Sequence, residues 1–283
     1  MNAVKTGILM LAIFALFMLI GSAFGANGMI LAFVFALALN GITYWFSDKI
    51  VLAMYRAQEV PEDKAPRLHE IVAELAQAAG IPKPKVYVIQ SASPNAFATG
   101  RSPQHAAVAV TTGILKILDD GELKGVLAHE LAHVTNRDIL IASIVATVAA
   151  AITLLATIIK YGAIFGGMGG RSRDNEGGNP IALLALAILA PFAAMFIQLW
   201  LSRTREYAAD EFGARLAHDP LLLASALGKL DRASRQLPME ANQVTAHMFI
   251  VKPFSGRGML SIFSTHPPIE ERIARLRKMA GRR

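Results

Sequence analysis

Long apolar stretches without charge alternate along this chain with blocks rich in charged residues. No Asp, Glu, Lys or Arg stands between Lys5 and Asp48. A helix needs about 20 apolar residues to cross a membrane, so this stretch is long enough for two crossings. Two later stretches each have the length of one crossing. The pattern therefore predicts four transmembrane helices in two hairpins, near residues 6–24, 29–47, 139–159 and 181–201.

Two other interpretations of the apolar stretches are open. The first stretch could be a cleaved signal peptide, because Lys5 is a minimal basic start and Ala23-Phe24-Gly25 resembles a cleavage site. The second apolar stretch follows at once, however, and a cut there would leave another membrane helix at the new N-terminus. The third and fourth stretches are rich in alanine and could be buried helices of a soluble domain. We expect membrane crossings in all four cases.

The charged blocks between the apolar stretches predict a mostly α fold with a small β-sheet. The first block contains one amphipathic helix over residues 66–79, two short strands over 85–89 and 106–111, and a helix that a capping box at Asp119–Glu122 opens. The segment 93–100 is predicted to be a loop or an irregular edge, and the second block to be mostly helical. The predicted parts are an N-terminal transmembrane hairpin over 1–47, a half-domain over 48–138, a second transmembrane hairpin with a glycine-rich loop over 139–201, and a C-terminal half-domain over 202–283.

Composition narrows the functional classes. Hydrophobic residues make up 54% of the chain and charged residues 17%, whereas soluble domains carry roughly 25% charged residues. This balance excludes intrinsic disorder. The absence of cysteine excludes a disulfide-stapled scaffold, a cysteine-ligated zinc module and a thiol nucleophile. The net charge is +7, but no aromatic residues interleave with the basic C-terminal cluster, so we expect a lipid bilayer and no nucleic acid as partner.

The sequence His129-Glu130-Leu131-Ala132-His133 carries the chemistry of the first block. Residues four apart lie on one face of a helix, so both imidazoles can point at one metal ion. Glu130 can face the same cavity and take a proton from a metal-bound water. The spacing predicts a catalytic metal site with Glu130 as general base.

Two histidines leave such a site one protein ligand short, since a catalytic zinc keeps three ligands and one open position. No third histidine follows at the metzincin spacing, where Ile139 and Ser143 stand. The best candidate is Glu206, directly after the fourth apolar stretch, and Asp210 one turn later could accept the outer N–H of a ligating imidazole. Glu211 is the alternative ligand if the helical register differs.

These residues resemble the HtpX family of membrane metalloproteases, which is related to the CAAX prenyl proteases. The resemblance rests on four motifs and covers essentially the whole chain: His129 to Asp138, Glu206 to Asp210, the Pro94-Asn95-Ala96-Phe97-Ala98 loop and Ser264-Thr265-His266-Pro267-Pro268. It implies an α+β gluzincin-type zinc endopeptidase (EC 3.4.24.-) with one Zn²⁺ per chain. It also implies a place in the bacterial cytoplasmic (inner) membrane, with the active site facing the cytosol, and misfolded or damaged membrane proteins or unfolded polypeptides as substrates.

The resemblance extends to three further polar residues. His266 and Arg272 could reach the oxyanion or the substrate backbone, as in the prenyl proteases, and peptide hydrolysis needs such a donor. The alternative for Arg272 is a surface charge. Asn95 could bind the substrate backbone along an edge strand, and turn chemistry after Pro94 is its alternative.

A shared metal also constrains topology and function. His133 and Glu206 can bind one ion only if the chain between them crosses the membrane an even number of times. The positive-inside rule favours a cytosolic site, although Arg171 and Arg173 in the glycine-rich loop oppose it.

Two other functions stay open: a prenyl-protein-type protease, and a non-catalytic membrane scaffold with a relic metal site. A His₂Glu site would also accept cobalt or manganese, and the sequence indicates no oligomeric state.

Overall fold

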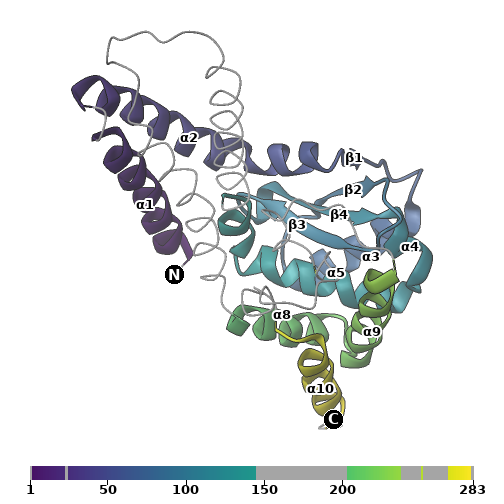
Figure 1. Ribbon diagram of the computed structural model, residues 1–283. Helices are drawn as coiled ribbons and strands as arrows, with labels where there is room; N and C mark the ends of the chain where they lie inside the picture. The colour runs from purple at the N-terminus through teal and green to yellow at the C-terminus, as the bar shows by residue number, and fades with distance from the viewer. Residues whose placement is uncertain (1, 23–24, 145–202, 237–249, 251–266, 282–283) are drawn as a thin grey trace.

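The computed structural model describes residues 2–22, 25–144, 203–236, 250 and 267–281 (Figure 1). The predicted crossing at 181–201, most of the crossing at 139–159, the glycine-rich loop and His266 lie outside these residues. The described part is mostly helical with one small sheet, as the sequence predicts. Its helices and strands are α1 (Asn2–Ser22), α2 (Gly25–Met54), β1 (Gln58–Glu59), α3 (Pro66–Ala79), β2 (Lys85–Ile89), β3 (Ala96–Gly100), β4 (Ala106–Thr111), α4 (Thr112–Ile117), α5 (Asp120–Thr135), α8 (Arg203–Leu216), α9 (Pro220–Gln236) and α10 (Ile269–Ala280).

Helices α1 and α2 form an apolar hairpin that extends away from the sheet (Figure 1). Within the described part of the chain, α2 is the one helix of sufficient length and hydropathy to cross a membrane; α1 has a shorter apolar core, Thr6–Leu19. Large apolar side chains are exposed along α2, among them Leu31, Val34 and Leu37. This exposure is expected of a helix whose surroundings are lipid rather than water.

Helix α2 continues past the predicted end at residue 47. Its last turns carry Val51 and Leu52, which are buried against Phe97 of β3 and Ala107 and Ala109 of β4. The apolar hairpin is therefore joined to the sheet through one unbroken helix, without a linker between them.

The sheet has four strands in the order β1-β2-β4-β3. Strands β2 and β4 are parallel and occupy the predicted residues, whereas β1 and β3 are antiparallel edge strands. The segment predicted as a loop or irregular edge is thus β3, with Phe97 opposite Ala109. All five β3 residues are buried, so both faces are covered and the sequence shows no alternation of apolar and polar side chains.

Helix α5 lies at the centre of the fold, between the sheet and the C-terminal helices (Figure 1). Its predicted capping box is confirmed: Glu122 N donates to Asp119 Oδ1 at 2.9 Å, and Asp119 N donates to Glu122 Oε2 at 3.1 Å. Helix α8 packs closely on α5 at Gly213, where a Cβ would lie 2.7 Å from the His129 backbone nitrogen. This close approach brings the first turn of α8 over the histidines of α5.

Candidate metal centre

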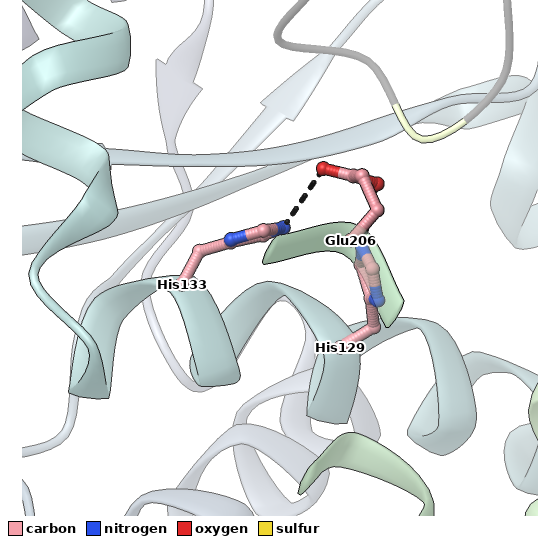
Figure 2. A group of neighbouring side chains, drawn as sticks. All are labelled: His129, His133 and Glu206. Atoms are coloured by element: carbon pink, nitrogen blue, oxygen red, sulfur yellow. Dashed lines mark ion pairs between the residues drawn. The ribbon is translucent and has the colours of Figure 1, made fainter. Parts of the chain in front are cut away.

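His129 and His133 on α5 face Glu206 on the first turn of α8 (Figure 2). Glu206 Oε2 lies 3.7 Å from His129 Nε2, and its Oε1 lies 3.5 Å from His133 Nε2. One ligand atom from each of the three residues falls within 4.8 Å of the other two. The structure therefore brings together the three ligands that the sequence predicts.

The donor set fits a zinc ion. Zn²⁺ bonds of about 2.0–2.1 Å place neighbouring ligands of a tetrahedron about 3.4 Å apart. The two histidine–glutamate separations, 3.5 and 3.7 Å, are close to that edge. Two imidazoles and one carboxylate leave a fourth position for water or substrate, which is typical of catalytic zinc sites.

His129 is oriented from its outer ring nitrogen. Its Nδ1 lies 2.9 Å from Asp210 Oδ1, so Nδ1–H donates to the carboxylate and Nε2 is left to face Glu206. Arg272 holds Asp210 in turn, with Nε donating to Oδ2 at 2.9 Å and Nη2 to Oδ1 at 2.7 Å. Its Nη1 donates to the backbone oxygen of Ile250 at 3.3 Å. Arg272 is completely buried, so its interpretation as a surface charge is wrong.

His133 has a matching partner that the sequence reasoning missed. Its Nδ1 lies 3.4 Å from Asp138 Oδ2, and Arg205 Nη1 lies 3.3 Å from Asp138 Oδ1. Asp138 reaches back because Arg137 adopts a left-handed conformation, with φ of 57°, and turns the chain after α5. The available signal was an acidic residue that directly precedes an apolar stretch, where a charge needs a partner.

Glu130 is held beside β3. Its side chain is buried, and its Oε2 accepts the backbone N–H of Ala98 at 3.0 Å. This bond fixes the carboxylate between the histidine helix and the edge strand. The N–H of Ala98 points away from β4. Alternate residues of a strand direct their backbone groups to the same side, so those of Ala96 also point away from β4.

Burial and charge shift the pKa values of this site in opposite directions. Burial lowers the pKa of His129, and Asp210 opposes only part of that effect. At His133 burial also lowers the pKa, but the neighbouring carboxylates, Asp138 first, outweigh it and raise the pKa to about 9. Burial raises the pKa of Asp210, yet Arg272 and His129 outweigh it and lower the pKa to about 2. The carboxylates around His133 thus favour positive charge there, which a proton or a metal ion can supply.

The other predicted site residues are placed as follows. Glu211 is exposed and ion-paired with Arg215, so Glu206 and not Glu211 faces the histidines. Asn95 is buried at the start of β3, where its Oδ1 accepts Ala96 N at 3.1 Å and its own N donates to Thr111 Oγ1 at 2.8 Å. His266 lies outside the described residues.

The family model of peptidase family M48 matches residues 62–280, which is most of the chain and includes the whole metal centre. The chain belongs to peptidase family M48. It is 56% identical over 277 residues to a "Protease HtpX homolog" of Syntrophobacter fumaroxidans, covering 97% of this chain and 98% of that protein. The homologue of Persephonella marina is 55% identical over 287 residues, with 100% and 99% covered.

A solved structure shares this fold. The crystal structure of S. mikatae Ste24p aligns with a TM-score of 0.53 at 20% sequence identity, covering 97% of this chain and 65% of that one. At this identity the likeness concerns the fold alone. The family match and the HtpX relatives confirm the resemblance to the HtpX family and the enzyme class: the protein is a metalloprotease.

Proposed function

We propose that this M48 peptidase is a zinc endopeptidase of the bacterial cytoplasmic membrane that cleaves misfolded or damaged membrane proteins. One observation supports it above all. His129, His133 and Glu206 converge in a buried site, and each histidine has a carboxylate on its outer nitrogen. A scaffold with a relic site would have no need of such ligand orientation.

Zinc bound by these ligands would polarise the substrate carbonyl and lower the pKa of a water molecule to about 7. Glu130 would accept a proton from the attacking water and pass it to the leaving amine. The hydrogen bond from Ala98 N would fix this carboxylate before substrate arrives. The proposed role of Glu206 is to bind the metal ion and not to transfer a proton.

The outer edge of β3 is the proposed binding strand for the substrate backbone. β3 is an edge strand, and an extended peptide can add to such an edge by main-chain hydrogen bonds. The outward N–H groups of Ala96 and Ala98 already donate to Asn95 and Glu130, so the substrate would pair with the outward carbonyl oxygens. Asn95 holds the beginning of this strand through its bonds to Ala96 and Thr111. We therefore assign Asn95 an indirect role in substrate binding: it would hold β3 in the position in which the strand pairs with the substrate backbone.

Arg272 is assigned a positioning role instead of direct contact with the oxyanion. Three of its N–H groups donate to Asp210 and to the backbone of Ile250, and Nη1 also lies 3.8 Å from Glu206 Oε2. Because Arg272 is completely buried and bonded in pairs to Asp210, its proposed role is to hold the carboxylate that orients His129. His266 remains the proposed donor to the oxyanion.

The proposed topology has four crossings, with the parts 1–47, 48–138, 139–201 and 202–283 and the metal centre on the cytosolic side. The apolar surface of α2 supports the first hairpin. Asp138 and Arg205 form an ion pair, which supports a topology in which the two ends of the segment 139–201 lie on the same side of the membrane. This topology would have an even number of crossings between them.

Casein degradation by the purified protein in detergent tests the proposed reaction. We expect hydrolysis that a zinc chelator abolishes and added Zn²⁺ restores. Hydrolysis that persists at full rate after the metal has been removed would overturn the zinc mechanism. Failure of the zinc-loaded protein to cleave casein or any unfolded membrane protein would favour the scaffold.

A further inference from the structure

The lipid-exposed character of α2 ends within a single turn. Exposed aromatic side chains, Trp45 and Phe46, follow the exposed aliphatic ones, and the first charges, Asp48 and Lys49, come one residue later. From Gly25 to this point the helix rises about 33 Å, which matches a hydrocarbon core of about 30 Å. Aromatic residues followed by lysine are typical of the boundary between lipid and water.

Two cations lie over the aromatic rings of this turn. The Arg101 guanidinium lies 4.7 Å from the centroid of the Trp45 ring, and Lys49 Nζ lies 5.5 Å from that of Phe46. Arg101 directly follows β3, so it comes from the protease domain and not from the membrane helix. Arg101 and Trp45 thus join the tip of the edge strand to the end of the membrane helix.

A second contact fixes the same tip. Thr99 Oγ1 and Ser143 Oγ are buried and 2.8 Å apart. Ser143 lies between Ile141 and Ile144, which pack against Leu39 of α2 and Leu9 of α1. The first contact holds the end of β3 against α2, and the second holds it against the segment 141–144, which packs on the apolar hairpin.

We propose that Trp45, Lys49 and Arg101 form a binding surface for the headgroups of anionic phospholipids. Arg101 lies over the Trp45 ring, and the N–H groups of a guanidinium are donors that bind phosphate in pairs. Lys49 adds a second cation, and Asp48 brings one negative charge into the same turn. The two cations lie where the apolar surface ends, at the depth of lipid phosphates.

The surface has a consequence for substrates, which rests on the proposed function of β3. Ala98, whose N–H binds Glu130, precedes Arg101 by three residues, or about 10 Å of strand. The catalytic carboxylate would then lie within about 10 Å of the headgroup layer along β3. Substrates would be cleaved in segments that emerge directly from the bilayer.

Tryptophan fluorescence tests the lipid surface independently of proteolysis. The chain has 2 tryptophans, so Trp200→Phe leaves Trp45 as the single probe. The full-length protein is reconstituted in phosphatidylcholine vesicles that contain phosphatidylglycerol, with one or the other lipid brominated. Quenching of Trp45 then gives the relative association constant of the two lipids.

We expect both lipids to quench Trp45, with a preference for phosphatidylglycerol that weakens at high salt. Arg101→Gln should reduce this preference about fivefold, because one basic side chain near the surface is lost. Arg101→Lys keeps the charge and should keep most of the preference. The matched control is Lys64→Gln, which removes one exposed charge from the loop between β1 and α3 and should change nothing.

Three results would overturn the proposal. If neither brominated lipid quenches the fluorescence of Trp45, this residue does not lie at the bilayer. Equal association of both lipids with the parent protein shows that the surface does not select anionic headgroups. If Arg101→Gln and Lys64→Gln reduce the preference for phosphatidylglycerol equally, the preference reflects net charge alone. Each result leaves the proposed protease reaction intact, because no cleavage is measured.

Discussion

The two histidines of the candidate metal centre each contact an aspartate that an arginine binds in turn, but the contacts of these two arms differ in length. On the side of His129, the contacts to Asp210 and from Arg272 are 2.7–2.9 Å long, and the arginine side chain is completely buried. On the side of His133, the contacts through Asp138 and Arg205 are 3.3–3.4 Å long, and side-chain exposure reaches 19% at Arg205.

The difference follows from where each arm comes from. The His129 arm joins α5 to α8 and α10 inside the protein core, where charges must be paired to be tolerated. The His133 arm joins residues that flank the second apolar segment, 139–201, near the protein surface. We infer that the first arm fixes the geometry of the candidate metal centre, while the second arm allows adjustment where the apolar segment begins and ends.

Removal of the buried arginine should have the largest effect on stability. Arg272→Met leaves Asp210 as an uncompensated buried charge, and we expect the free energy of unfolding to fall by about 3–5 kcal/mol. Arg205→Met, on the looser arm, should cost about 1 kcal/mol or less. Chemical unfolding in detergent measures both, with the exposed Arg215→Met as control.

A double variant sharpens this result. Arg272→Met combined with Asp210→Asn removes both charges, so it should be more stable than Arg272→Met alone. A double variant that is less stable than the single one would contradict the interpretation of Arg272 as a charge partner of Asp210.

A methyl group at Gly213 should destabilise the packing of α8 on α5, which positions Asp210 beside His129. Its Cβ would lie 2.7 Å from the His129 backbone nitrogen, so Gly213→Ala should push α8 from α5 and cost about 1–3 kcal/mol. The control is Gly228→Ala on α9, where the nearest atoms are 3.9 Å away. Thermal unfolding of the two variants compares them, and equal stability would show that α8 and α5 do not need this close approach.

Zinc affinity should follow the same asymmetry. Loss of a carboxylate that orients a ligating histidine typically costs 10–100-fold in metal affinity. We expect Asp210→Asn to approach the upper end of this range and Asp138→Asn the lower end. Competition with a fluorescent zinc chelator measures both constants. A larger loss in Asp138→Asn would reverse the order of the two arms.

Local sequence patterns predicted the site residues on α5, whereas the contacts between distant segments depend on long-range packing. His129, Glu130 and His133 follow from helical spacing behind a capping box, which both lie within one helix. Glu206 was found because the ligand set required a carboxylate. The strand character of β3 was missed because its small residues are buried on both faces. Asp210 and Arg272 stand 62 residues apart, and no sequence periodicity relates them.

The central claim is that Glu206 binds the metal and Glu130 moves the proton. The most direct measurement is the zinc content and the peptide hydrolysis rate of two variants, Glu130→Gln and Glu206→Ala. Glu130→Gln should keep near one equivalent of zinc while hydrolysis falls by at least about 10²–10⁴-fold, and Glu206→Ala should lose zinc and hydrolysis together. Zinc lost in Glu130→Gln but kept in Glu206→Ala would reverse the two roles, and hydrolysis that survives in Glu130→Gln would contradict the mechanism.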